Sequence, residues 1–204
     1  MLIPFDEGIT TVVGRTRSGK TYGTLKSLAA ERRGVLFFNT QLEDVPKGFV
    51  RADGKNTFEQ IRETLRKGKK VNFLPSTVDS VRKAQLTFLI NNFFDGSMDD
   101  FFFVVDEVHL YTDDKATKAA LVRLATTGVR FGKRGVWISQ RGAKIDNTLM
   151  TQSTRFIFYE TNMEGQYYRN YGIPHDDIAA RIVAGGKYSY CVFDGKTVEG
   201  AYKV

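Results

Sequence analysis

The chain has 204 residues, of which 42% are hydrophobic, 13% aromatic and 26% charged. This composition is typical of one globular domain with a sizeable core, and it excludes intrinsic disorder. Apolar runs such as residues 101–105 are far shorter than the roughly 18 residues that cross a bilayer, so we expect no transmembrane segment. A single cysteine excludes an internal disulfide, and the first residues do not resemble a signal peptide, so we predict a soluble intracellular protein.

The net charge is positive. Lysine and arginine together number 30 and the acids 23, which gives +7. The excess is concentrated between residues 15 and 83, where 16 basic residues stand against 7 acids. Such a field favours a polyanionic partner, but it also serves solubility, so charge alone does not identify nucleic acid as that partner.

Short apolar runs alternate with helix-like segments along most of the chain. In order, we expect strand 9–13, helix 20–31, strand 35–38, helix 57–67, strand 71–74, helix 80–94, strand 101–105, helix 115–127, and strands 136–138 and 156–158. Strands that are continuously apolar and separated by helices indicate a parallel sheet covered on both faces. The predicted fold class is therefore α/β.

The pattern changes from about Met163. One or two short helices are expected there, followed by a hairpin of strands 188–193 and 197–203 that turns at residues 194–196. We interpret residues 161–204 as an extension of the same domain, whose core covers about 9–160. Residues 1–204 are thus predicted to form a single domain.

A glycine-rich loop follows the first expected strand directly. Residues 14–21 fit G-x-x-x-x-G-K-[ST] and stand between a strand and a helix, as a phosphate-binding loop requires. Amides of the loop and of the helix start would bind phosphate, Lys20 would place its charge between the β- and γ-phosphates, and Thr21 would bind Mg²⁺. The predicted nucleotide-binding residues are Gly14, Arg15, Thr16, Arg17, Ser18, Gly19, Lys20 and Thr21.

Two arginines distinguish this loop. Arg17 stands where many such loops carry glycine or another small residue, and Arg15 lies nearby. They could add positive charge near the nucleotide, or they could face solvent or a neighbouring subunit. The sequence does not choose between these alternatives.

The strand 101–105 ends in two acids. Asp106 is placed to hold Mg²⁺ through water, and Glu107 to polarise the attacking water. A GTPase would show D-x-x-G here and N-K-x-D later, and the chain has neither; a nucleotide kinase needs no hydrolytic glutamate. The pair therefore predicts hydrolysis of ATP rather than switching or phosphotransfer.

Two further polar residues lie near these motifs in the sequence. His109 completes a D-E-x-H box like that of helicases, but helicases need two RecA-like domains, so we interpret it as a partly buried structural histidine. Gln140 follows the strand 136–138 within Ser139-Gln140-Arg141. In a RecA-like sheet this strand lies beside the acidic one, so Gln140 is predicted to reach the γ-phosphate, orient the water and sense the departure of phosphate.

With these three motifs, residues 9–158 resemble the FtsK/HerA superfamily of DNA-pumping ATPases. The size and sequence are most similar to the genome-packaging NTPases of turreted icosahedral archaeal viruses. The resemblance implies a RecA-like P-loop NTPase core, ATP and Mg²⁺ as cofactors, and a hexameric ring around double-stranded DNA. It also implies that the protein fills a preformed capsid in the host cytoplasm, at a vertex formed by capsid or internal-membrane proteins, and that it can be retained in the virion.

Charge develops on the γ-phosphate oxygens during hydrolysis, and Lys20 and Mg²⁺ lie on one side of them. Nothing in one domain of this size closes the other side, so we expect an arginine from a neighbouring subunit. Arg130 is the first candidate because it follows the helix 115–127 on a connection. Arg134 and Arg123 are the second and third candidates. Arg130, Lys133 and Arg134 precede the sensor strand, where the family has a basic segment facing the adjacent subunit.

Other basic clusters have a simpler interpretation. Arg32-Arg33 and the run Arg66-Lys67-Gly68-Lys69-Lys70 each follow an expected helix, so we interpret them as helix ends and solvated turns rather than DNA contacts. Two alternative functions remain open at this point. One is a P-loop ATPase that moves protein in secretion or virion morphogenesis, and the other is a nucleotide-dependent assembly factor with little turnover.

Overall fold

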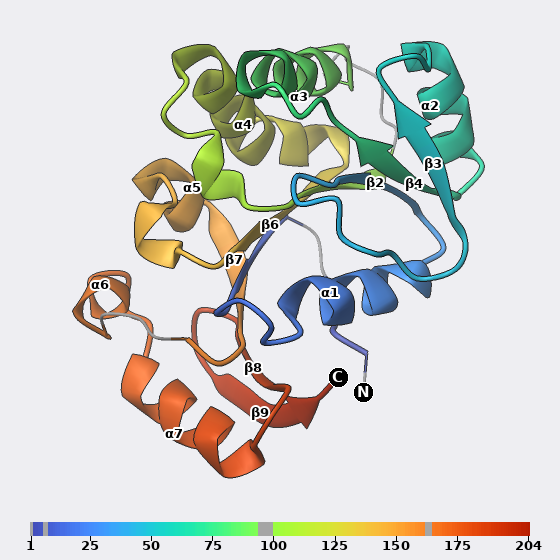
Figure 1. Cartoon of the computed structure of the whole chain (residues 1–204). Coiled ribbons are helices and arrows are strands. Elements are labelled where there is room, and N and C mark those ends of the chain that lie inside the picture. Colours follow the sequence, from blue (N-terminus) through green and yellow to red (C-terminus); the bar gives the residue numbers. More distant parts are fainter. Residues whose placement is uncertain (1, 6–7, 94–99, 162–164) are drawn as a thin grey trace.

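A computed structural model describes residues 2–5, 8–93, 100–161 and 165–204 of the chain. Nine strands in these residues form one sheet in the order β3-β4-β2-β5-β6-β1-β7-β8-β9, shown in Figure 1. The strands are β1 (Ile9–Val13), β2 (Gly34–Phe38), β3 (Phe49–Asp53), β4 (Lys70–Leu74), β5 (Phe101–Val105), β6 (Lys133–Ser139), β7 (Ser153–Phe158), β8 (Ser189–Phe193) and β9 (Val198–Lys203). All pairs from β3 to β7 are parallel, whereas β8 and β9 run antiparallel.

Helices connect the parallel strands. They are α1 (Lys20–Ala29), α2 (Phe58–Arg66), α3 (Asp79–Phe93), α4 (Lys115–Thr126), α5 (Asn147–Thr151), α6 (Gly165–Arg169) and α7 (His175–Gly185), with short 3₁₀ turns η1 (Val108–Leu110), η2 (Gly128–Phe131) and η3 (Gly142–Lys144). Side chains cap three of the starts, since Thr57 forms a capping box with Gln60 before α2, and Asp114 and Asp146 cap α4 and α5. No helix within the described ranges is both long and apolar enough to cross a membrane.

The core lies in two layers, one on each face of the sheet. Leu25 and Leu28 of α1 pack on one face with alternate strand residues such as Val104. Helices α2 to α7 supply the other layer, which includes Leu86 and Leu121. Figure 1 shows α1 on one side of the sheet and α3 and α4 together on the other. Burial of both faces explains why the central strands are continuously apolar.

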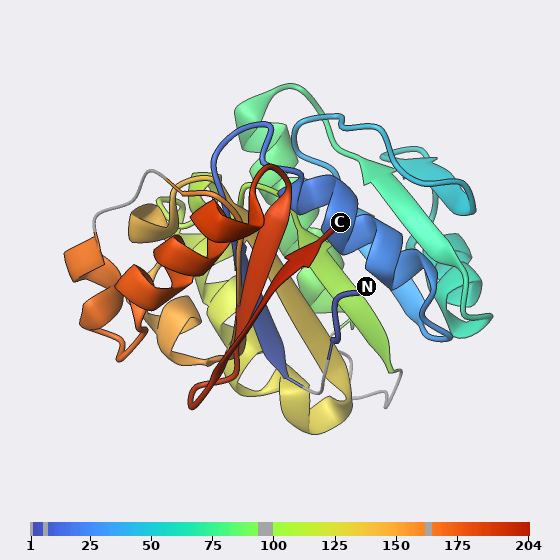
Figure 2. The same ribbon diagram turned by 90° about the horizontal axis from the view of Figure 1, so that it is seen from below.

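The predicted α/β architecture is confirmed, including the short helices and hairpin of the tail. Figure 2 shows β8 and β9 extending the same sheet with α7 beside them. Two expectations fall outside the described residues, namely the end of the third helix at Phe94 and the change of pattern at Met163. Strand β3 was not predicted, because it is a half-exposed edge strand of sequence Phe-Val-Arg-Ala-Asp and lacks an apolar run.

Parallel strands give the sheet two chemically distinct edges. We call the edge where β1, β5 and β6 end, at Val13, Val105 and Ser139, the carboxyl edge. The opposite edge, where β2, β4 and β5 begin, at Gly34, Lys70 and Phe101, is the amino edge. Every predicted motif that follows a strand therefore lies at the carboxyl edge.

Candidate functional site

The phosphate-binding loop connects β1 to α1 at the carboxyl edge. Gly19 is the N-cap of α1 and adopts a left-handed conformation with φ of 90°, which a side chain would strain. Lys20 and Thr21 lie in the first turn of the helix and are buried, 7% and 8% exposed. The first-turn amides of a ten-residue helix thus lie next to a buried cation, an arrangement that favours a phosphate group.

The two loop arginines differ in their surroundings. Arg15 forms an ion pair with Glu160, 2.7 Å from Nη2 to Oε2, and its amide donates to the Glu160 carbonyl. Arg17 is exposed and left-handed, with φ of 62°. This backbone conformation explains why many such loops carry glycine at this position. Arg15 therefore pairs within its own chain, whereas Arg17 faces outward.

Asp106 follows β5 and is 1% exposed. Its amide and carbonyl are held by Phe38 and Thr40, but no described residue forms a regular hydrogen bond with either carboxylate oxygen. Burial, with the negative charge of Glu107, raises the pKa of Asp106 to about 7, although Lys20 acts in the opposite direction. Buried carboxylate oxygens with no regular hydrogen bond are suited to a cation, so together with the Thr21 hydroxyl this oxygen donor set fits Mg²⁺.

Glu107 lies at the centre of a polar network. Its backbone is left-handed, with φ of 49°, and its side chain is buried. One carboxylate oxygen lies 3.7 Å from Lys20 Nζ. The other lies 3.2 Å from His109 Nδ1 and accepts a hydrogen bond of 3.1 Å from the backbone N–H of Gln140. Burial alone would raise the pKa of Glu107, but His109, Lys20 and the Gln140 amide outweigh it and hold the pKa below its ordinary value. The carboxylate is therefore charged and oriented, as a general base must be.

His109 is buried, as the sequence interpretation expected, but it also contacts the candidate base. Its Nδ1 lies 2.9 Å from Ser139 Oγ, which in turn accepts the Arg141 amide. The histidine thereby connects Glu107 to the end of β6. Sequence reasoning missed this contact, and the only signal for it was the D-E-x-H spacing.

Gln140 lies between the acidic strand end and the phosphate loop. Strand β6 pairs with β5 on one side, as predicted, and with β1 on the other. The Thr16 hydroxyl donates to Oε1 of Gln140, so the side chain already contacts the loop. A polar cleft of about 690 Å³ opens beside Gln140 and His109. The arrangement places a side-chain amide where the loop, the candidate base and the cleft meet.

The candidate arginines for a neighbouring site do not lie at the carboxyl edge. Arg130 is exposed on η2, near the amino edge, where it cannot reach the phosphate loop of its own chain. The expectation that Lys133 and Arg134 precede the sensor strand is wrong, because both are buried within β6. Lys133 lies over the Phe101 ring and Arg134 pairs with Asp100. Arg123 donates to Asn91, so Arg130 is the candidate best placed to project outward.

The sequence matches no family model and no curated protein. Its fold matches the genome packaging NTPase of Sulfolobus turreted icosahedral virus 2 in complex with AMPPCP, with a TM-score of 0.67 at 15% identity over 97% of this chain and 98% of that one. The fold is that of a RecA-like P-loop NTPase. The related structure with ATP-gammaS aligns with a TM-score of 0.62, at 15% identity over 97% of both chains.

The chain also matches parts of longer proteins. Thermomonospora curvata EccC (ATPases 2 and 3), in complex with a signal sequence peptide, aligns with a TM-score of 0.57 at 14% identity over 96% of this chain and 37% of that one. The resemblance predicted from the three motifs is thus confirmed at the level of the fold.

Proposed function

We propose that this protein is an ATP-hydrolysing motor that translocates double-stranded DNA, most specifically a viral genome into a preformed capsid. The observation that carries the proposal is the convergence of the loop residues 14–21, Asp106, Glu107 and Gln140 at one edge of the sheet. The related structures in complex with AMPPCP and ATP-gammaS support the binding of ATP by this chain.

Each residue has a distinct role in this proposal. Loop amides and Lys20 bind the phosphates and neutralise their charge. Glu107 accepts a proton from the water that attacks the γ-phosphorus, and the bond to the ADP oxygen breaks. Gln140 orients that water and, through Thr16 and its amide contact with Glu107, links the loop to the base. Thr21 and Asp106 would hold Mg²⁺, which supplies positive charge beside the phosphate oxygens.

The complete site includes a neighbouring subunit. An exposed arginine on η2 suits a contact with the next copy, so we assign Arg130 as the finger in trans. The assembly we propose is a homo-oligomeric ring, a hexamer by resemblance, that encloses duplex DNA and docks on capsid or internal-membrane proteins at a vertex. It would act in the host cytoplasm.

A second candidate cargo is protein, since the EccC match contains a signal sequence peptide. ATPase activity with and without duplex DNA, measured beside the mass of the assembly, separates the two. A DNA motor hydrolyses ATP faster with DNA, and its binding weakens steeply with salt because counterions are released. Hydrolysis that ignores DNA but responds to a peptide would overturn the proposed cargo.

The remaining alternative is an assembly factor with little turnover. Steady phosphate release well above that of the Glu107→Gln variant excludes it. The proposed motor should also bind duplexes without sequence preference, through backbone contacts. Competition between unrelated duplexes of equal length tests this, and a hundredfold preference for one would contradict it.

A further inference from the structure

Two basic clusters that are far apart in the sequence lie side by side at the amino edge. Arg32 and Arg33 form the turn between α1 and β2, and Arg66 and Lys67 lie at the end of α2, before β4. Strand β4 pairs in parallel with β2 as well as with β3, and its pairing with β2 brings the two turns together. Each cluster alone is a basic helix end, but the fold combines them into one surface.

Two glycines allow the turns to approach this closely. A Cβ atom on Gly34 would lie 2.4 Å from the Leu65 carbonyl oxygen, and one on Gly68, whose φ is 71°, would lie 2.5 Å from the Arg32 carbonyl oxygen. Both contacts are with backbone, which cannot move aside as a flexible side chain would. The juxtaposition of the two basic clusters is therefore built into the packing of the turns.

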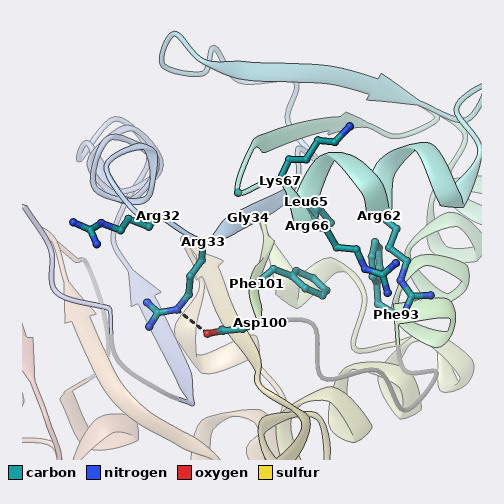
Figure 3. A pocket seen from close by; sticks show the side chains of 11 residues that line it. Arg32, Arg33, Gly34, Arg62, Leu65, Arg66, Lys67, Phe93, Asp100 and Phe101 are labelled. Carbon is teal, nitrogen blue, oxygen red and sulfur yellow. Dashed lines mark hydrogen bonds and ion pairs between the residues drawn. The ribbon is translucent and has the colours of Figure 1, made fainter.

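Between the turns lies a pocket of about 480 Å³, shown in Figure 3. Its lining includes five basic side chains and one acid; these are Arg32, Arg33, Arg62, Arg66, Lys67 and Asp100. Arg62 and Arg66 extend together from α2 toward the Phe93 ring, while Arg33 reaches Asp100 from the opposite turn. We call this feature the amino-edge pocket.

Two ion pairs in the amino-edge pocket, those of Arg33 with Asp100 and of Lys67 with Glu63, are exposed enough to exchange partners. Arg33 Nε lies 2.8 Å from Asp100, but their side chains are 37% and 42% exposed. Asp100 also forms an ion pair with Arg134. Lys67 pairs with Glu63 across one helical turn in a still more exposed position. Exposed pairs contribute little and are screened by salt, so a phosphate can replace a carboxylate at small cost. A guanidinium fork matches phosphate oxygens in geometry as well as in charge.

We propose that the amino-edge pocket binds the phosphodiester backbone of the duplex DNA that this motor moves. The inference rests on the proposed function for the identity of the cargo. Fork-shaped donors around an open pocket contact backbone without reading bases, which suits a motor that ignores sequence. Because the pocket lies at the edge opposite the phosphate loop, DNA and ATP occupy one subunit at the same time.

The test compares two variants that change charge equally. The pocket variant carries Arg32→Glu and Lys67→Glu, two exposed residues whose replacement leaves the core intact. The control variant carries Lys187→Glu and Lys196→Glu, which are exposed next to the C-terminal hairpin. Duplex affinity is measured over a range of salt concentrations, together with ATPase activity without DNA.

The pocket variant is expected to bind duplex at least about tenfold more weakly, with a log–log salt slope smaller by about 2 because two phosphate contacts are lost. The control variant should keep the wild-type slope, and both should keep wild-type ATPase activity without DNA. Equal loss of affinity in both variants, or none in the pocket variant, overturns the inference while the motor proposal stands. Wild-type protein that binds no duplex overturns both proposals. A pocket variant with impaired DNA-free ATPase and normal DNA affinity places the pocket at a subunit interface instead.

Discussion

The charged side chains of the nucleotide site and those of the amino-edge pocket differ in burial. At the carboxyl edge Lys20, Asp106 and Glu107 are almost completely buried, at 7%, 1% and 3% exposed. At the amino edge the paired side chains of Arg33 and Asp100 stay more than a third exposed. Strand β5 connects the two sets, since Asp100 precedes it and Asp106 follows it.

The contrast separates chemistry from binding. Buried charges are costly to desolvate, so they persist where position matters, as it does for a base or a metal ligand. Exposed charges exchange partners easily and respond to salt, which suits contact with a moving polyanion. Substitutions at the carboxyl edge should therefore abolish turnover, whereas those at the amino edge should change affinity.

The largest expected effect would break this separation. Arg130 lies near the amino edge, yet we expect Arg130→Ala to reduce ATP turnover by roughly 10³- to 10⁵-fold, because the arginine completes the carboxyl edge of a neighbouring subunit. The measurement titrates Arg130→Ala protein, inactive alone, with Glu107→Gln protein, also inactive alone. Activity should reappear, since some interfaces in mixed rings contain both intact groups. Proven mixed assembly without recovery would count against a finger at this position.

The next effect sharpens the role of the carboxyl edge. Glu107→Gln should reduce turnover by about 10²- to 10⁴-fold while nucleotide affinity is kept, because the amide cannot accept the proton of the water. Lys20→Ala should instead abolish nucleotide binding, because the phosphate charge is no longer neutralised. Equilibrium binding and phosphate release distinguish the two variants. Wild-type turnover by the Glu107→Gln enzyme would show that the base is elsewhere.

A smaller effect tests the buried network. Removing His109 takes away a contact that lowers the pKa of Glu107, so the acidic limb of the ATPase pH profile should move to higher pH in His109→Phe. On that limb, near and below the ordinary glutamate pKa of about 4.3, a shift of one pH unit should lower activity by about tenfold, while activity at pH 8 should be unchanged. The readout is the position of the limb, which a general loss of stability would leave unchanged. A uniform loss at all pH values assigns His109 a structural role only.

The last effect concerns stability rather than turnover. Asp106 has a pKa of about 7 in the folded chain against about 4 when unfolded, so between these values the folded state binds the extra proton. Stability of the nucleotide-free, metal-free protein therefore falls as pH rises through this window. Relative to Asp106→Asn, the wild type should lose about 2 to 3 kcal/mol of unfolding free energy between pH 5 and pH 8. Urea unfolding of both proteins at pH 5 and pH 8 measures this difference. An equal change of unfolding free energy with pH in the wild type and in Asp106→Asn would contradict the burial argument.

The sequence predicts the central strands and the phosphate loop because both depend on local patterns. Continuous apolar runs mark strands buried on both faces, and the order of the motifs places Gln140 beside the acidic pair. The buried start of β6 escaped prediction, since Lys133 and Arg134 are stabilised by the Phe101 ring and by Asp100, which lie far away in the chain. The amino-edge pocket was not predicted either, because it is created by the pairing of β2 with β4, which are far apart in the chain.

Strand β1 is synthesised early, but it pairs with two strands that are synthesised late. Thr11 of β1 lies between Trp137 of β6 and Phe156 of β7, so the strand that carries the phosphate loop is nearly the first to be synthesised and must wait for its two neighbours. Such non-local pairing makes folding slow and late in synthesis. A nascent chain that ends before β7 therefore lacks a supported phosphate loop. Nucleotide binding thus reports that β1 has paired with both of its neighbours, so ATP is held only by chains synthesised past β7.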